Sequence, residues 1–280
     1  MNSRLDILAF WEKQFEQSNL DSPRLSAQVL LAHVLGIPRL EMLLEARAGV
    51  PESAAADMDA LSRRRLHGEP VAYLVGMKEF YGLDFEVSPA VLIPRPETEL
   101  FLDRLLTAHE RSAQMKLLDL GTGSGVLAVT CAVHLPNILV TAVDISSAAL
   151  QMAQRNANRH GVQDRVMFVR GNLIEAVHVG SFDIIVANLP YVPESKRDTL
   201  SREVLAHEPE VALFAGWDGL DLYRRLAAGL AGRVRPGTQL LCEIDHGQGD
   251  AMVEIFEPVA KDVVVEKDYA GLDRLVCVVF

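Results

Sequence analysis

The residues best suited to chemistry are Asn188, Leu189, Pro190 and Tyr191, which directly follow the apolar run 182–187. Such a run is typical of a buried parallel strand, and strands of this kind end at the ligand-binding edge of a sheet. The carboxamide oxygen of Asn188 can accept a hydrogen bond from an N–H group. Pro190 restricts Leu189 to extended geometry and so directs its carbonyl, while Tyr191 offers a flat ring. These groups suit a planar nitrogen nucleophile, although an ordinary turn after a strand has a similar composition.

A glycine-rich segment lies upstream, where residues 119–125 are Asp-Leu-Gly-Thr-Gly-Ser-Gly. It follows the apolar stretch 116–118 and precedes residues 126–133, which have helical length and composition. Glycines let the backbone approach a ligand closely, and free N–H groups at a helix N-terminus favour a carboxylate or phosphate. A strand, a glycine-rich turn and a helix in this order predict a cofactor site.

The spacing of the glycines favours one cofactor. The dinucleotide pattern G-x-G-x-x-G requires a glycine where this chain has Val126, whereas D-x-G-x-G-x-G resembles motif I of class I S-adenosylmethionine-dependent methyltransferases. The next predicted strand, 138–143, ends in Asp144, whose carboxylate can accept from ribose hydroxyls of either NAD or S-adenosylmethionine. The Asn-Leu-Pro-Tyr segment separates the two, because amino-group methyltransferases use such a segment and dehydrogenases do not.

Length and composition predict a compact protein of the cytoplasm. The 280 residues leave room for two domains, and 49% are hydrophobic, which argues against disorder. No apolar stretch approaches a membrane span, and the first residues form no secretory signal. Cys131, Cys242 and Cys277 lie in apolar predicted elements without paired spacing, so we expect buried thiols and no metal site.

The charge balance disfavours stable binding to nucleic acid. Lys and Arg total 27 and Asp and Glu total 38, which gives a net charge of −11. Affinity for nucleic acid depends largely on neutralising phosphates. The basic runs 63–65 and 224–225 lie in helical patterns and are typical of solvated helix faces. A protein or a small molecule is the better expected substrate.

The elements predict two domains joined by a linker. Residues 1–75 form a small helical domain for substrate recognition, with Ser22-Pro23 starting its second helix. Residues 76–97 form a hairpin with its loop at 82–84, followed by a proline-rich linker in which Arg95 either contacts a ligand or forms a hinge salt bridge. Residues 98–280 form the methyltransferase domain, and the long connection 192–220 belongs to its substrate cleft.

Strands alternate with helices in the C-terminal domain, which predicts an α/β fold with a mostly parallel Rossmann-like sheet. The last two predicted strands, 263–267 and 274–280, are joined by only six residues. A parallel crossover needs a longer connection, so the last strand is expected to be antiparallel. We also expect helices at 97–109, 125–134 and 146–160, with Ser146 as the N-cap of the third.

Nearly the whole chain resembles the release factor glutamine methyltransferases, a family of class I S-adenosylmethionine-dependent methyltransferases. The resemblance rests on the helical N-terminal domain, the glycine-rich turn, Asp144 and Asn-Leu-Pro-Tyr. More specific to the family are Ile-Pro-Arg-Pro-Glu-Thr-Glu at 93–99, Glu208-Pro209 and Gly-Trp-Asp-Gly-Leu at 216–220, together with segments 68–74 and 268–274.

The resemblance implies transfer of a methyl group from S-adenosylmethionine to the side-chain amide of the glutamine in the Gly-Gly-Gln motif of class I peptide-chain release factors. Asn188 and Tyr191 would be catalytic, and Asn188 through Tyr191 would bind the glutamine. The cofactor would be bound by Gly121, Thr122, Gly123, Ser124, Gly125, Asp144, Asn172, Leu173 and Asn188. Two positions depart from the family pattern: Leu189 replaces a proline, and Asn172 replaces a common Asp.

Two other functions remain open at this point. An adenine or cytosine amino-methyltransferase acting on DNA or RNA would use the same four residues on a flipped base. A regulatory module could instead bind S-adenosylmethionine without catalysis. The acidic balance counts against the first alternative, and the candidate groups present at both motifs count against the second.

Overall fold

A computed structural model describes residues 3–280, so Met1 and Asn2 of the first predicted domain lie outside it. The chain forms two compact units, which are described separately. The first unit contains residues up to Met77 together with Ser201–His207, and the second contains Lys78–Leu200 and Glu208–Phe280. The division into recognition domain, linker and methyltransferase domain, with boundaries after residues 75 and 97, stays a prediction.

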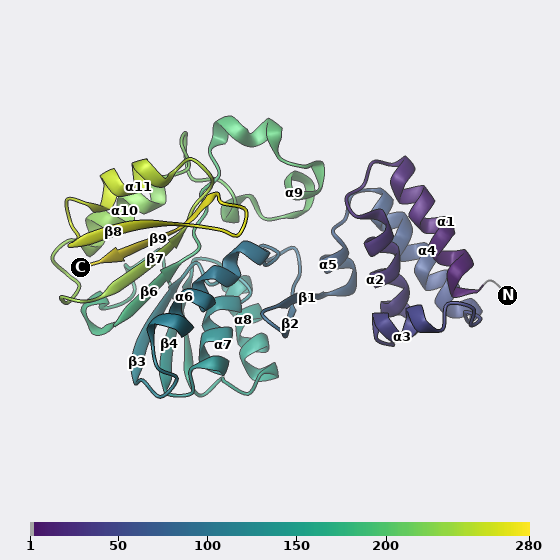
Figure 1. The fold of residues 1–280 in the computed structure, drawn as a ribbon, viewed down its shortest axis with the longest axis horizontal. Coiled ribbons are helices and arrows are strands. Elements are labelled where there is room, and N and C mark those ends of the chain that lie inside the picture. The colour runs from purple at the N-terminus through teal and green to yellow at the C-terminus, as the bar shows by residue number, and fades with distance from the viewer. Residues whose placement is uncertain (1–2) are drawn as a thin grey trace. The chain divides into compact units, whose positions relative to one another are not determined.

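The first unit is a helical bundle (Figure 1). Its core contains Trp11, Phe15, Leu30, Met42 and Met58, which are almost completely buried. The first unit consists of α1 (Arg4–Gln17), α2 (Pro23–Leu35), α3 (Arg39–Leu44), α4 (Glu52–Leu66), α5 (Val71–Val75) and α9 (Arg202–His207).

The starts of the first two helices differ in their capping. Ser3 and Asp6 form a capping box, in which each side chain accepts from the backbone N–H of the other. Ser22 is the N-cap residue of α2 as predicted, but its φ of 49° is left-handed and its side chain makes no capping bond. The predicted helix start at Ser22-Pro23 is therefore confirmed. Pro23 begins the helix with φ already restricted and with no N–H to satisfy.

A buried arginine joins α9 to the rest of the first unit. Arg65 on α4 is 2% exposed, and its Nη1 lies 2.5 Å from Glu203 Oε2 on α9 and 3.1 Å from the Glu69 carbonyl. A charge at this depth is tolerated because it is paired and hydrogen-bonded. Helix α9 lies within the stretch 192–220, for which the sequence predicted no regular element.

A hairpin of β1 (Met77–Phe80) and β2 (Leu83–Glu86) begins the second unit, apart from Met77, which belongs to the first. Its turn is Tyr81-Gly82, with φ of 52° and 75°, and not the predicted loop at 82–84. Tyrosine rarely adopts positive φ, which is why the sequence does not reveal this turn. Tyr81 is held there by Glu99 Oε1, which accepts from its N–H at 2.8 Å, and by Asp103 Oδ1, which accepts from its hydroxyl at 2.9 Å.

The second unit is built on a mostly parallel sheet, as predicted. Within residues 3–280 this sheet has seven strands in the order β5-β4-β3-β6-β7-β9-β8. Strands β3 to β7 are parallel to one another, and β9 is antiparallel to both β7 and β8, which confirms the predicted reversal of the last strand. The strands are β3 (Met115–Leu120), β4 (Ile138–Asp144), β5 (Val166–Arg170), β6 (Ile184–Ala187), β7 (Gln239–Glu243), β8 (Asp262–Lys267) and β9 (Asp273–Val279).

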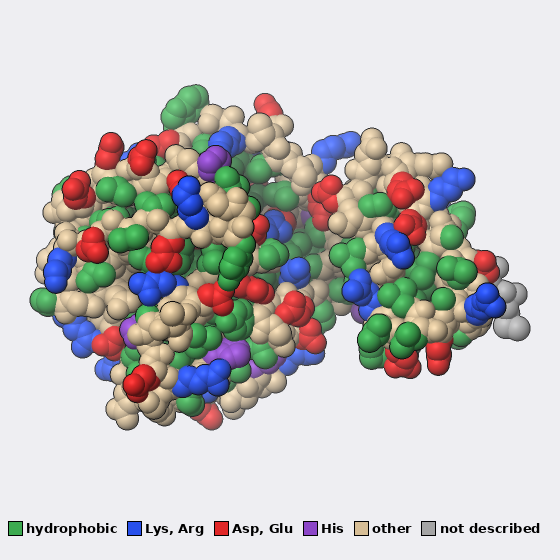
Figure 2. Space-filling view, viewed as in Figure 1, with side chains coloured by type: hydrophobic (Ala, Val, Ile, Leu, Met, Phe, Trp, Pro, Cys, Tyr) green, Lys and Arg blue, Asp and Glu red, His purple; other side chains and the backbone are tan. Residues whose placement is uncertain are grey.

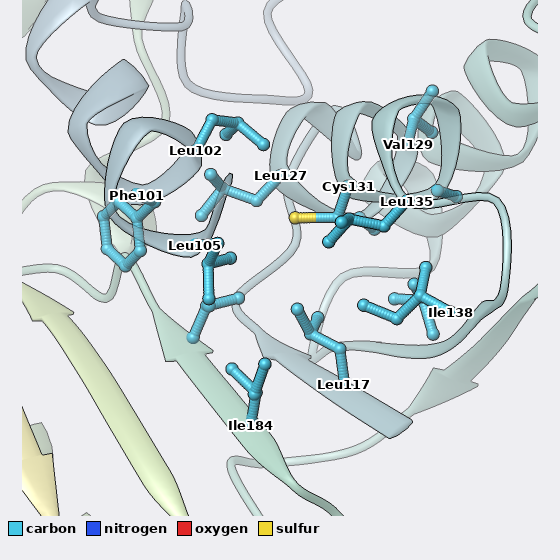
Figure 3. Packing of buried hydrophobic residues seen from close by; sticks show 14 of the residues in the cluster. Phe101, Leu102, Leu105, Leu117, Leu127, Val129, Cys131, Leu135, Ile138 and Ile184 are labelled. Atoms are coloured by element: carbon cyan, nitrogen blue, oxygen red, sulfur yellow. The ribbon is translucent and has the colours of Figure 1, made fainter. Parts of the chain in front are cut away.

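Helices cover both faces of the sheet (Figure 1). Leu117 and Ile184 face the layer of α6 (Leu100–Ala108), α7 (Val126–His134) and α8 (Ser147–Arg159), as Figure 3 shows for α6 and α7. The next residues along the same strands, Leu118 and Ile185, face the layer of α10 (Asp221–Leu230) and α11 (Gly249–Phe256). This alternation follows from the two-residue period of a strand.

The remaining compositional predictions concern cysteines and membranes. Cys131, Cys242 and Cys277 are free and buried, and burial raises the pKa of each thiol. Among the described residues, no helix combines the length and apolar character needed to cross a bilayer.

Candidate functional site

Four parallel strands bring the predicted site residues to one edge of the sheet. Leu120 of β3 pairs with Ala187 of β6, and Ala187 pairs with Cys242 of β7. Gly121 and Asn188 follow one residue later, so their backbones are neighbours. The chain runs from β3 through β4 to β5 on one side and returns to β6 on the other, so β3 and β6 flank a topological switch point, where α/β sheets bind ligands.

A cavity at this edge collects most of the predicted site residues. All residues that line it belong to the second unit. Gly125 and Tyr191 are not among its lining residues. The predicted residues that line it are Gly121, Thr122, Gly123, Ser124, Asp144, Asn172, Leu173, Asn188, Leu189 and Pro190.

The glycine-rich turn brings backbone to the cavity wall. Gly121 and Gly123 have φ of 72° and 56°, a region that other residues adopt only with strain. A Cβ on Gly121 would lie 3.2 Å from Leu189 Cδ2, so the turn and the Asn-Leu-Pro-Tyr segment pack against each other. Gly125 has a different role: it is the N-cap of α7, and a Cβ there would lie 2.9 Å from the Cβ of Ala153 on α8.

Asp119 stabilises the glycine-rich turn through hydrogen bonds. It is 1% exposed, and its Oδ2 accepts from Thr122 Oγ1 at 2.6 Å and from the Ala128 N–H at 3.2 Å. Ala128 lies in the first turn of α7, so the carboxyl group binds one of the free N–H groups there. Burial raises the pKa of Asp119 to about 7, although both hydrogen bonds oppose the shift.

Asp144 lies at the end of β4 and orders the backbone around it. Its Oδ2 accepts from the Gly123 N–H at 2.9 Å, and its Oδ1 accepts from the Ser146 N–H at 2.8 Å. Burial raises its pKa, and these backbone hydrogen bonds oppose the shift. Each carboxylate oxygen can accept a further hydrogen bond, so both retain capacity for a ligand hydroxyl. Ser146 also caps α8, as predicted, by accepting from the Ala149 N–H at 3.2 Å.

Leu173 adopts a strained backbone beside the cavity. Its φ of 52° is unusual for a bulky residue and costs on the order of 1–3 kcal/mol. Gly171, two residues before Leu173, has no room for a side chain, because a Cβ would lie 2.6 Å from the Cβ of Ala176. Packing therefore holds the 171–173 turn in a conformation that places Asn172 and Leu173 on the cavity wall.

A second set of polar side chains forms a connected network near the cavity. It consists of Thr98, Asn188, Tyr191 and Glu243 and is here called the Asn188 network. Asn188 Nδ2 donates to Thr98 Oγ1 at 3.1 Å and to Glu243 Oε2 at 3.2 Å. Thr98 Oγ1 donates to Glu243 Oε2 at 2.7 Å, and the Tyr191 hydroxyl donates to Glu243 Oε1 at 3.0 Å. Three side chains from two other segments are thus tied to the carboxyl group of Glu243.

Burial dominates the electrostatics of this network. Glu243 is 1% exposed, and burial raises its pKa, while the hydrogen bonds from Thr98 and Tyr191 and the charge of Arg274 oppose the shift. Burial and the nearby Glu243 hold the pKa of Tyr191 well above its usual value, so this phenol stays protonated and can donate. Tyr191 therefore supports Glu243 from outside the cavity wall, and its predicted stacking on substrate stays a prediction.

Two family-specific segments form further parts of the wall. Arg95 lines the cavity and its Nη2 lies 2.5 Å from Glu208 Oε1, while Glu208 Oε2 accepts from the Ile93 N–H at 3.2 Å. Of the two roles predicted for Arg95, the salt bridge is present, and its place on the wall leaves ligand contact open. This pair ties the proline-rich linker to residues 208–212, of which Pro209 and Ala212 also line the cavity.

The segment Gly216 to Leu220 packs against the end of Asn-Leu-Pro-Tyr. Gly219 has φ of 80°, and a Cβ there would lie 2.0 Å from the Tyr191 carbonyl oxygen, which no side chain could accommodate. Gln248 joins the two segments, because its Nε2 donates to the carbonyls of Tyr191 at 2.9 Å and Asp218 at 3.0 Å. Glycine at 219 is thus required for this contact.

Sequence reasoning missed Thr98 and Glu243. Glu243 is the last residue of the parallel strand β7, so the rule that singled out Asp144 and Asn188 could have found it. Thr98 lies in the segment 93–99 that carries the family resemblance, but no strand end marks it, and its side chain reaches Glu243 across 145 residues of sequence.

Two parts of the chain match known family models. Residues 6–76 match the PrmC N-terminal domain, and residues 96–215 match the methyltransferase small domain. Among solved structures, a methyltransferase from Pyrococcus furiosus has a TM-score of 0.55 and 21% identity, covering 79% of this chain and 98% of that one. This likeness concerns the fold.

Relatives of similar length carry one name. The release factor glutamine methyltransferase of Chlorobaculum tepidum is 42% identical over 93% of this chain and 91% of its own length. The enzyme of the same name from Koribacter versatilis is 42% identical over 94% of both chains. This degree of identity over nearly the full length shows that the chain belongs to the release factor glutamine methyltransferase family.

Proposed function

We propose that this enzyme transfers a methyl group from S-adenosylmethionine to the side-chain amide nitrogen of the glutamine in the Gly-Gly-Gln motif of class I release factors. The observation that carries the proposal is the position of Asn188: its amide lies on the wall of the cavity that contains the glycine-rich turn. The names of the full-length relatives support the choice of substrate.

The residues around the cavity suit S-adenosylmethionine. Backbone at Gly121 and Gly123 leaves room for a ligand, and Asp144 retains acceptor capacity for ribose hydroxyls. Asn172 and Leu173 would hold the adenine. When bound, the cofactor supplies a methyl group on a positively charged sulfur, and the methyl group moves to nitrogen as the S–C bond breaks.

The chain's own contribution is to hold and stabilise a weak nucleophile. An amide nitrogen reacts poorly because its lone pair is delocalised into the carbonyl. Asn188 Oδ1 and the Leu189 carbonyl can accept from its two N–H bonds and hold the nitrogen toward the methyl donor. Both acceptors also stabilise the positive charge that grows on nitrogen, and the extra proton can leave to water after transfer. No strong base is required.

Surface charge favours a protein substrate over nucleic acid. On the face drawn in Figure 2, acidic and basic side chains are interspersed over the second unit, and this face carries no extended basic patch. The net charge of −11 agrees with this view. We infer that the first unit, which matches the PrmC N-terminal domain, helps to bind the release factor.

Methyl transfer can be tested directly with labelled S-adenosylmethionine. Purified protein is incubated with a class I release factor, with the same factor carrying alanine in place of the Gly-Gly-Gln glutamine, or with RNA. We expect label only in the first sample, at that glutamine. Label in RNA, in the alanine variant or in no sample would contradict the proposal.

A further inference from the structure

The side-chain amide of Asn188 is held in one orientation. Nδ2 carries two hydrogens, and its two acceptors are Thr98 Oγ1 at 3.1 Å and Glu243 Oε2 at 3.2 Å. If the amide were turned over, Oδ1 would face the Glu243 carboxylate, and the Nδ2 hydrogens would lose both partners. The amide nitrogen therefore belongs on the protein side, and Oδ1 is left to accept from a ligand.

Thr98 can accept from the Asn188 amide because its single hydroxyl hydrogen is directed elsewhere. Thr98 Oγ1 donates that hydrogen to Glu243 Oε2 at 2.7 Å, so its lone pairs are available to the Asn188 amide. The donor direction thus runs from Asn188 to Thr98 and from Thr98 to Glu243. Since Glu243 accepts every one of its contacts in the network, its ionised form fits them all.

Glu243 is itself firmly placed. The Tyr191 hydroxyl donates to its Oε1 at 3.0 Å. The fully buried Tyr223 on α10 places its hydroxyl between the carbonyl oxygens of Glu243 and Ala187, the residues that end β7 and β6. This contact links the strand that carries Glu243 to the strand that precedes Asn188, in addition to their backbone pairing.

We propose that Thr98 and Glu243 are positioning residues for methyl transfer, which hold the Asn188 amide with Oδ1 toward the substrate nitrogen. The inference rests on the proposed function and deepens it, because both residues would act through Asn188 and not directly on the reacting atoms. The buried carboxylate also polarises the Asn188 amide and so makes Oδ1 a better acceptor. Its negative charge favours the positive charge that develops on the substrate nitrogen.

Thr98 offers a pair of variants that separates the hydroxyl from the volume of its side chain. Thr98→Val removes the hydroxyl and keeps the shape, whereas Thr98→Ser keeps the hydroxyl. We expect Thr98→Val and Glu243→Gln to lower kcat about tenfold or more, with the cofactor Kd and the KM for release factor within about threefold of wild type. Thr98→Ser keeps the hydroxyl, so its kcat should stay within about threefold of wild type.

Thr130→Val is the matched control for loss of a buried threonine hydroxyl. Thr130 lies on α7, is fully buried, and its Oγ1 has no hydrogen-bond partner among residues 3–280. We expect its kcat to equal that of wild type. Unchanged kcat in both Thr98→Val and Glu243→Gln would overturn the proposal. So would an equal loss in Thr98→Ser and Thr98→Val, which would indicate a packing role.

A second measurement keeps this inference separate from the choice of substrate. In a ¹⁵N-labelled sample, both Asn188 Nδ2 hydrogens should exchange slowly with solvent, and Thr98→Val should speed exchange of the hydrogen that points to Thr98. Fast exchange of both in the wild type would overturn the fixed amide. If release factors were not methylated while exchange stayed slow, the proposed function alone would fail.

Discussion

The cavity wall beside β3 and β4 is built largely of backbone, whereas the wall beside β6 and β7 is built of interlocked side chains. In the first, Gly121 and Gly123 present main chain, and two carboxyl groups that also line the cavity, those of Asp119 and Asp144, accept hydrogen bonds from the turn. In the second, the Asn188 network ties the side chains of Thr98, Asn188 and Tyr191 to the buried carboxyl group of Glu243.

This difference reflects what each wall has to do. Binding a large cofactor needs close approach and many weak contacts, which backbone supplies when side chains are absent. Orienting one small amide needs a few acceptors in fixed directions, which requires side chains locked by their neighbours. Damage to the first wall should therefore appear in cofactor affinity, and damage to the second in kcat.

The largest effect is expected from Asn188→Ala. Loss of its Oδ1 removes an acceptor for the substrate N–H and stabilisation of the growing positive charge, so kcat should fall about 10²- to 10³-fold. Isothermal titration should find the Kd for S-adenosylmethionine within about threefold of wild type. Near-normal turnover in this variant would contradict the mechanism.

Asp144→Ala should show the opposite pattern. Its carboxylate orders the Gly123 and Ser146 N–H groups and keeps acceptor capacity for a ligand hydroxyl, so its loss should weaken cofactor binding about 10- to 100-fold. At saturating cofactor, kcat should largely recover. Asp144→Asn keeps one acceptor oxygen, so its Kd for the cofactor should lie between those of wild type and Asp144→Ala. An unchanged Kd in Asp144→Ala would remove this residue from the cofactor site.

A smaller effect is expected from Gly123→Ala, with Gly161→Ala as its control. Both glycines have positive φ, 56° and 67°, and neither has a side-chain atom close to where a Cβ would lie. Each substitution should destabilise the fold by about 1–2 kcal/mol through backbone strain. Only Gly123 lines the cavity, so only Gly123→Ala should also weaken cofactor binding. Equal cofactor Kd values in the two variants would show that backbone at 123 does not approach the ligand.

The last expected effect concerns stability, not activity, and appears in the dependence of stability on pH. The pKa of Asp119 is raised from 3.8 to about 7, so between these values the folded state keeps a proton that the unfolded state loses. The free energy of unfolding should therefore fall as pH rises through this interval, and Asp119→Asn should lack that contribution. Thermal unfolding across the interval tests this, with the exposed Asp57→Asn as control. Parallel pH profiles for wild type and Asp119→Asn would contradict it.

Much of the fold and one wall of the cavity could be predicted from the sequence, because both depend on local patterns. Apolar runs and the short link before β9 gave the sheet and its reversed strand. The glycine spacing indicated the turn, and strand ends indicated Asp144 and Asn188. The role of Thr98 could not be predicted, because it depends on a side chain 145 residues away in the sequence. The turn at Tyr81 could not be predicted, because contacts with Glu99 and Asp103, distant in the sequence, stabilise the unusual φ of Tyr81.

The position of β9 sets an order in which the enzyme can become complete during its synthesis. Strands β3, β4 and β5 and the 171–173 turn have all been made by residue 173, so the wall with the glycine-rich turn can assemble early. Strand β9 is made after β7 and β8 but lies between them, and its Leu275 pairs with Glu243. Until β9 enters the sheet, β7 has an open edge. A growing chain could thus gain the means to bind its cofactor about a hundred residues before it can orient the group to be methylated.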